Sequence, residues 1–112
     1  MTTILSFLLQ SAFDGFNVCI FAYGQTGSGK TFTMIGNDEY PGIAPRAFNG
    51  LFEIIKENSA KFETKVSVYM VELYCDSLQD LLATKEDQGT KYVIKKDKKG
   101  MVYVLGSRVE RE

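Results

Sequence analysis

Histidine is absent from this sequence, and cysteine occurs only twice in its 112 residues. Structural zinc sites are built from histidines and from closely spaced cysteine pairs, and the sequence offers neither. It therefore gives no indication of a zinc centre. Cys19 and Cys75 each lie inside an apolar run, which is typical of reduced core residues in an intracellular protein.

Neither sign of charge is in excess: Lys and Arg total 13, Asp and Glu total 14, and the formal net charge is −1. This balance gives no indication of binding to nucleic acid or to a membrane surface. No apolar run approaches the ~18 residues of a transmembrane helix. No basic residue precedes Lys30, so the basic start of a secretory signal is missing. We therefore expect a soluble, cytosolic protein.

The N-terminal segment has the pattern of an amphipathic helix that ends near Ala12. Its apolar residues recur at helical spacing, namely Ile4, Leu5, Leu8, Leu9 and Ala12. Turn residues at 14–17 stop this helix and precede a continuous apolar run, Val18–Tyr23. Such a run between turn residues predicts a strand buried on both faces.

A second helical pattern runs from Lys30 to Ile35 and is interrupted by a polar, glycine-containing surface loop at 36–42. The helix restarts near Pro45, a residue suited to a first helical turn. Its apolar residues then fall on one face, namely Phe48, Leu51, Phe52 and Ile55. We expect this face to pack against a sheet.

Strand patterns dominate the second half of the chain. Glu63–Tyr74 is rich in β-type residues, and Asp76–Ser77 is expected to cap a short helix after it. Beyond a polar loop, residues 92–94 and 101–104 predict two strands around a hairpin turn at Asp97–Gly100.

The most specific pattern is a glycine-rich loop of the form G-x-x-x-x-G-K-[ST], which follows an apolar run and opens a helix. Three glycines would let successive backbone N–H groups point at an anion. Lys30 would reach the β- and γ-phosphates of a nucleoside triphosphate, and the Thr31 hydroxyl would bind Mg²⁺. The expected phosphate-binding residues are Gly24, Gln25, Thr26, Gly27, Ser28, Gly29, Lys30 and Thr31. The alternative is a glycine-rich turn with an incidental lysine.

Helices and strands that alternate after such a loop predict an α/β fold of the P-loop NTPase type. Hydrolysis also requires an acidic residue at a strand end and a group that positions water. Glu72, which ends an apolar run, is one candidate, and a solvent-facing strand residue is the alternative interpretation. The sequence shows no complete hydrolytic site.

The segment from Leu9 to Met34 resembles the kinesin motor domain almost residue for residue, above all in Phe21–Thr31. Gly42–Ala47, Val71–Tyr74 and the hairpin around Gly100 agree with the same family. The resemblance covers essentially the whole chain. It implies a microtubule-dependent ATPase that uses ATP and Mg²⁺ in the cytoplasm, on microtubules.

The resemblance also implies roles outside the phosphate loop. Phe32 occupies the position at which family members contact adenine, although it could instead pack beneath its own helix. The lobe from Tyr92 to Val109 resembles the part of the family fold that touches tubulin. Its basic residues could meet the acidic tubulin surface or could be solvated, and they are Lys95, Lys96, Lys98, Lys99 and Arg108.

Two segments, Tyr69–Tyr74 and Ile94–Val102, are most similar to the C-terminal, minus-end-directed branch of the kinesins, and especially to its calmodulin-binding members. This similarity implies that calmodulin is a possible partner of a longer parent protein. It also implies dimerisation through a coiled coil outside these residues.

Residues 1–112 are expected to form a partial motor domain. The family's adenine-side Arg-x-Arg-Pro strand and its switch segments, Ser-Ser-Arg-Ser-His and Asp-Leu-Ala-Gly-Ser-Glu, do not occur in the sequence. We therefore expect no appreciable ATP turnover by the chain alone, and a marginal or aggregating fold. The alternatives are a non-catalytic fragment that binds nucleotide or tubulin, and another P-loop enzyme such as a nucleotide kinase. A kinase would need clustered lid arginines, which Arg46, Arg108 and Arg111 do not supply.

Overall fold

The computed structural model describes residues 3–87, 89–107 and 110–111. The chain divides into two compact units, Met1–Thr64 and Lys65–Glu112. The first unit is helical and contains α1 (Thr3–Phe13), α2 (Lys30–Met34) and α3 (Ile43–Glu57). The second unit holds the strands. No helix in the described part of the chain is long and apolar enough to cross a membrane.

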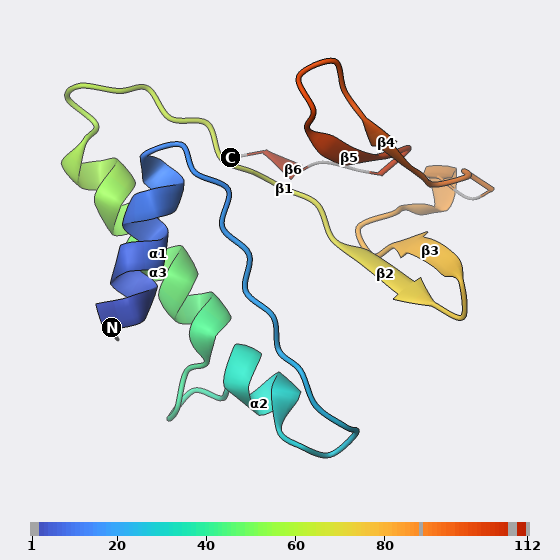
Figure 1. The fold of residues 1–112 in the computed structure, drawn as a ribbon, viewed down its shortest axis with the longest axis horizontal. Coiled ribbons are helices and arrows are strands. Elements are labelled where there is room, and N and C mark those ends of the chain that lie inside the picture. The colour runs from blue at the N-terminus through green and yellow to red at the C-terminus, as the bar shows by residue number, and fades with distance from the viewer. Residues whose placement is uncertain (1–2, 88, 108–109, 112) are drawn as a thin grey trace. The chain divides into compact units, whose positions relative to one another are not determined.

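Helices α1 and α3 lie side by side and form the core of the first unit (Figure 1). Leu5 and Leu9 of α1 are buried, as the helical spacing of the N-terminal segment predicts. The rings of Phe13 and Phe62 meet edge to face with their centroids 6.2 Å apart. Helix α1 ends at Phe13, and Gly15 follows with a φ of 97°, which allows the Phe16 amide to donate to the Ser11 carbonyl at 3.0 Å.

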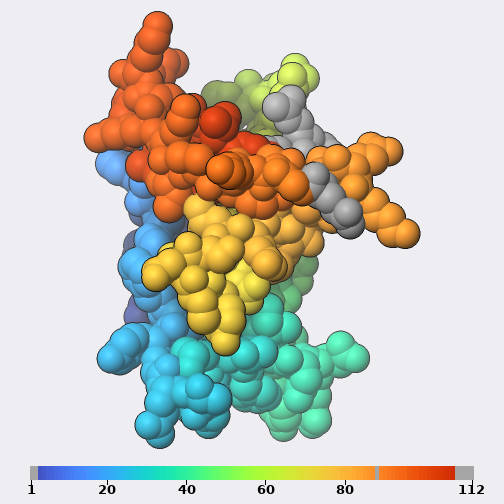
Figure 2. Space-filling view, turned by 90° about the vertical axis from the view of Figure 1, so that its right-hand side faces the viewer, coloured from blue at the N-terminus to red at the C-terminus, as the bar shows by residue number. Residues whose placement is uncertain are grey.

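The buried strand expected at Val18–Tyr23 is not present. This segment is extended but belongs to no strand, and its side chains are exposed, with Phe21 at 87% and Tyr23 at 99%. Atoms of this part of the chain, coloured blue, are visible on the surface in the space-filling view (Figure 2). The described strands pair only with one another. Val18–Tyr23 has the hydrophobic sequence of a central strand, but no described strand lies beside it to bury its side chains.

Two further expectations about burial are wrong for the same reason. Cys19 and Cys75 are both exposed free thiols rather than core residues. The apolar face of α3 packs in part on α1 and not on a sheet, and its Phe48 and Phe52 remain exposed. Helix α3 itself is confirmed, with Pro45 in its first turn.

The second unit consists of short antiparallel pairs and one 3₁₀ turn at Lys85–Asp87. The strands are β1 (Ser67–Val68) with β6 (Glu110–Arg111), β2 (Val71–Tyr74) with β3 (Ser77–Asp80), and β4 (Val93–Lys96) with β5 (Val102–Leu105). The long strand expected at Glu63–Tyr74 is therefore present only in its last part, as β1 and β2.

The short helix expected after Asp76–Ser77 is wrong, because these residues form the turn and first position of a β-hairpin. Cys75 and Asp76 have φ values of 48° and 60°, and Tyr74 pairs with Ser77. Two left-handed residues between paired strands match the twist of a hairpin, and aspartate tolerates this conformation well. The turn therefore directs the following residues into β3.

The hairpin of β4 and β5 confirms the prediction for residues 92–104. Lys96 pairs with Val102, and the Asp97 amide donates to the Met101 carbonyl at 2.8 Å. One carboxylate oxygen of Asp97 accepts the amides of Lys99 and Met101, each at 2.8 Å. Gly100, at φ 87°, completes the turn, and its amide donates to the Asp97 carbonyl at 3.1 Å.

Candidate functional site: the glycine-rich loop

The three glycines of the loop all have positive φ: 151° at Gly24, 80° at Gly27 and 93° at Gly29. A Cβ on Gly24 would collide with the Ser28 hydroxyl, so the first and fifth positions of the loop approach too closely for a side chain at residue 24. The Ser28 amide donates to the Gln25 carbonyl at 3.1 Å. The predicted curled backbone is therefore confirmed.

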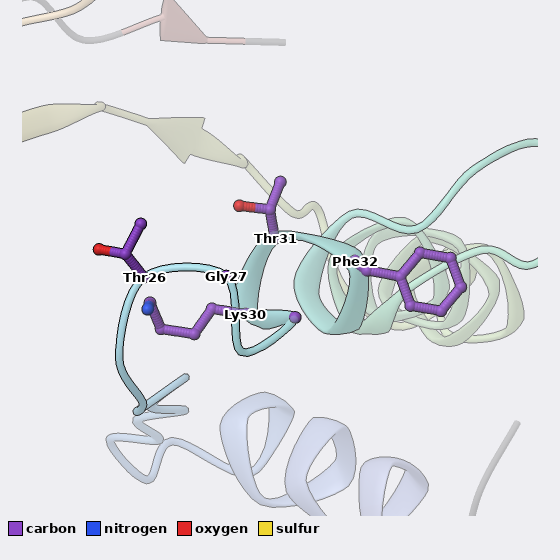
Figure 3. A pocket seen from close by; sticks show the side chains of 6 residues that line it. Thr26, Gly27, Lys30, Thr31 and Phe32 are labelled. Carbon is purple, nitrogen blue, oxygen red and sulfur yellow. The ribbon is translucent and has the colours of Figure 1, made fainter.

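The Lys30 side chain folds back along the loop (Figure 3). Its ammonium donates to the carbonyl oxygens of Gly24 and Gln25, the latter at 2.8 Å. This places the positive charge against the backbone that forms the loop. A lysine ammonium has three donors, so these two bonds leave one donor for an anion.

The loop also presents backbone donors. Among the described residues, none accepts a hydrogen bond from the amides of Gly27 and Gly29. Helix α2 follows directly, with Gly29 as its N-cap and no side-chain cap. Because the first N–H groups of a helix have no partner within the helix, they are open to a ligand as well. These donors and Lys30 fit a phosphate group.

An open pocket of about 440 Å³ lies along this loop and is lined by Thr26, Gly27, Gly29, Lys30, Thr31 and Phe32. The Phe32 side chain is 56% exposed and points away from Lys30 (Figure 3). Phe32 thus lines the loop pocket, and its contact with adenine stays a prediction. A second pocket of about 270 Å³ adjoins Lys30 on the side of Tyr23 and Thr33.

No acidic residue lines either of these two pockets. Glu72, the candidate acid for hydrolysis, is exposed on β2 in the second unit, opposite Gln79. This position fits the alternative interpretation of Glu72 as a solvent-facing strand residue. The residues that line these two pockets therefore supply no carboxylate that could bind Mg²⁺ or activate water.

The structure brings four of the five candidate tubulin-contact residues together on one hairpin. Lys95 and Lys96 lie on β4, and Lys98 and Lys99 lie in the turn after it, and all four are exposed. Adjacent strand residues point to opposite faces, so Lys95 and Lys96 face different sides of the hairpin. Arg108 lies outside the described residues.

Sequence reasoning missed a polar cluster around Tyr92 in the second unit. Tyr92, Asp80 and Asp87 line an open pocket of about 550 Å³. Partial burial raises the pKa of the Tyr92 phenol, and the negative charges of Asp80 and Asp87 raise it further. Asp80 is buried and accepts the Leu82 amide at 2.9 Å. No spacing in the sequence signals this cluster, because it depends on how β3 and the 3₁₀ turn fold.

A glycine-rich loop that follows an extended apolar segment and ends on a Lys-Thr helix is the arrangement of P-loop nucleotide-binding proteins. The family model described as "Kinesin motor domain" matches residues 1–111. The chain belongs to the kinesin motor-domain family.

Several plant and animal kinesins are similar to the chain. It is 58% identical to the kinesin-like protein KIN-14E of Arabidopsis thaliana and 56% identical to KIN-14I of rice, over 88% of the chain in each case. It is also 50% identical to human kinesin-like protein KIF13B over 74% of the chain. The resemblance to the C-terminal kinesin branch is thus confirmed by KIN-14 relatives. The chain spans 8% of the length of each of the two plant proteins.

A solved structure supports the fold. A kinesin mutant structure, described as revealing a signalling pathway for activation of the kinesin motor ATPase, superposes with a TM-score of 0.82 at 35% identity. The match covers 97% of this chain and 33% of the kinesin chain. The predicted α/β motor-domain class is therefore confirmed, and the chain corresponds to about a third of that solved structure.

Proposed function

We propose that this chain is the ATP-binding part of a microtubule-dependent motor ATPase, and that residues 1–112 form one portion of its motor domain. The observation that carries the proposal is the geometry of the loop. Positive-φ glycines, free amides at Gly27 and Gly29, and the Lys30 ammonium converge on one pocket. Membership of the kinesin motor-domain family supports ATP as the nucleotide.

Each residue of the loop has a distinct proposed role. The backbone N–H groups of Gly27 and Gly29 bind phosphate oxygens, and Lys30 neutralises the β- and γ-phosphates. The exposed Thr31 hydroxyl is placed one residue beyond Lys30, where it can hold Mg²⁺. Bound Mg²⁺ would offset the negative charge of the phosphates. The exposed Phe32 ring offers an apolar face to adenine.

ATP turnover requires groups beyond this loop. Since no acidic residue lines the two loop pockets, the described residues around them bind phosphate without activating water. We expect no appreciable ATPase activity from the 112-residue chain in a phosphate-release assay. A microtubule-stimulated rate measured on this chain would contradict that expectation.

We further propose that the β4–β5 hairpin binds tubulin through its lysines and places the protein on cytoplasmic microtubules. Four exposed lysines around one turn give a local positive charge on a chain whose net charge is −1. Such a patch suits an acidic partner. For the longer protein, similarity to the C-terminal branch supports a coiled-coil dimer and calmodulin as a possible partner.

The nucleotide-binding proposal is tested by titrating the chain with a fluorescent ATP analogue, with and without Mg²⁺. Lys30→Ala should weaken binding at least tenfold, because hydrogen bonds to charged groups contribute about 1.5–3 kcal/mol. Thr31→Ala should remove most of the Mg²⁺ dependence. Lys61→Ala, which removes an exposed lysine outside the pockets, should bind like the unmodified chain. Equal binding by Lys30→Ala and the unmodified chain would refute the proposal.

Microtubule co-sedimentation separates a motor-derived contact from a simple charge effect. Motor-derived binding should change between ATP-bound and nucleotide-free chain, and Lys98→Glu with Lys99→Glu should weaken it. Binding that ignores nucleotide and disappears at high salt would instead indicate a non-catalytic basic patch.

A further inference from the structure

Helix α2, which carries Lys30 and Thr31, is only five residues long. So short a helix has little stability of its own and depends on what holds its ends. At its C-terminal end, the Ile35 amide donates to the Thr31 carbonyl at 2.8 Å, and the Gly42 amide donates to the Ile35 carbonyl at 2.9 Å. Two hydrogen bonds therefore link Thr31 to the start of α3.

The connection between α2 and α3, residues 36–42, is closed on itself, and we call it the α2–α3 clasp. Gly36 and Pro41 form an antiparallel bridge. The Asn37 amide donates to the Tyr40 carbonyl at 3.0 Å, and the Tyr40 amide donates to the Asn37 side-chain oxygen at 2.7 Å. These bonds turn a polar surface loop into a compact element.

Arg46 of α3 forms a hydrogen bond with the C-terminal end of the clasp. Its Nε donates to the Pro41 carbonyl at 2.8 Å. Two consecutive residues thus hold the clasp in place. The Pro41 carbonyl is bonded to Arg46 of α3, and the Gly42 amide is bonded to the carbonyl of Ile35, which follows α2 directly. A pocket of about 550 Å³ lies beside it and is lined in part by Ile35, Pro41 and Phe48.

Two glycines make this close approach possible, for different reasons. Gly36 has φ +70°, and a Cβ there would collide with the Tyr40 carbonyl and the Gly42 amide. Gly42 has an ordinary φ of −77°, so its backbone would accept any residue. A Cβ on Gly42, however, would lie 2.5 Å from the Met34 carbonyl carbon and 2.7 Å from that of Ile35. Glycine is therefore required at residue 42 only because a side chain there would collide with the end of α2, and not because of backbone conformation.

We propose that Gly42 and Arg46 are positioning residues for nucleotide binding, acting through the clasp on Lys30 and Thr31. The inference rests on the proposed function of the loop. A side chain at residue 42 pushes against Met34 and Ile35, and the Ile35–Thr31 bond passes this displacement back one helical turn. Thr31, which would hold Mg²⁺, would then be displaced, although no residue that touches nucleotide has changed.

The test is the affinity of the full chain for a fluorescent ADP analogue, with Mg²⁺ and with excess EDTA. A displacement of about 1 Å remote from a site can reduce its function up to about a hundredfold. Gly42→Ala should therefore weaken Mg²⁺-dependent binding at least tenfold and lower the ratio of the two affinities. Gly15→Ala is the control for general destabilisation of the same unit, because alanine is strained at φ +97° but its Cβ meets nothing within 4 Å and lies outside the clasp. It should leave both affinities unchanged.

Arg46 provides a second pair of variants in case Gly42→Ala does not fold. Arg46→Met keeps the aliphatic stem but cannot donate to Pro41, whereas Arg46→Lys keeps a donor. Arg46→Met should weaken Mg²⁺-dependent binding about threefold or more, and Arg46→Lys should recover most of it. A merely structural role for Arg46 would lower the affinities measured with Mg²⁺ and with EDTA by the same factor, which leaves their ratio unchanged.

The outcomes separate this inference from the proposed function. If the unmodified chain binds no nucleotide, the proposed function and this inference both fall. If it binds, but folded Gly42→Ala and Arg46→Met keep its affinity and Mg²⁺ ratio, only the positioning role is overturned. A lowered ratio in either variant, with Gly15→Ala unchanged, supports it.

Discussion

Single residues decide what the glycine-rich loop can bind. Lys30 is held by the carbonyls of Gly24 and Gln25, so its charge lies against the loop before any ligand arrives. Gly27 and Gly29 line the pocket with positive φ values, and neither has a side chain that could cover its backbone. The site therefore depends as much on backbone conformation as on side-chain chemistry.

Gly29→Ala tests that dependence. No atom lies within 4 Å of the Cβ position, so the substitution adds no clash, and its effect comes from the left-handed backbone alone. The penalty for a non-glycine residue there is about 1–2 kcal/mol, which predicts nucleotide affinity roughly five- to thirtyfold weaker if the loop relaxes. Gly29→Asn should be milder, because asparagine tolerates this conformation. Equal losses for alanine and asparagine in the titration would argue against backbone strain as the cause.

Elements in this chain are set by short polar turns as much as by hydrophobic pattern. The Cys75–Asp76 turn forces Ser77–Asp80 into a strand, although Leu78, Leu81 and Leu82 have helical spacing. At the β4–β5 hairpin the pattern and the turn agree, and the structure confirms the expected strands. Local turn chemistry thus outweighed periodicity where the two conflicted.

Asp97→Ala tests the turn that presents the lysines. The Asp97 carboxylate accepts two amides, so its removal should destabilise the hairpin by about 1–2 kcal/mol. Amide hydrogen exchange at Lys99 and Met101 should become several-fold faster. Asp97→Asn retains a side-chain oxygen acceptor and should keep most of the protection. Unchanged exchange in Asp97→Ala would show that Gly100 and strand pairing suffice to hold the turn.

At the scale of the whole molecule, little of the described chain is shielded from water. Leu5 and Leu9 are the buried hydrophobic residues among the described positions, while large apolar side chains such as Phe21, Leu73 and Tyr74 are exposed. The Asn17–Tyr23 backbone has no hydrogen-bond partner in the described structure. An extended apolar segment with unpaired backbone groups is a template for strand addition.

The isolated 112-residue chain is therefore expected to self-associate. Size-exclusion chromatography with light scattering should show oligomers at micromolar concentration, and heating should give no sharp transition. Phe21→Lys with Tyr23→Glu should reduce association, because charges oppose strand addition. Phe7→Lys, an exposed change on α1, is the control and should have a smaller effect. A monodisperse monomer with cooperative unfolding would contradict this prediction.

The glycine-rich loop, the helices on either side of it and the β4–β5 hairpin could be predicted from the sequence, because each depends on residues close together in the chain. Positive-φ glycines at 24, 27 and 29, the α1 pattern and the Asp97–Gly100 turn all act locally. Burial could not be predicted in this way, since it depends on neighbours that are distant in the chain. The tertiary structure showed Val18–Tyr23 unpaired, α3 packed on α1, and the clasp that joins Gly42 to the end of α2.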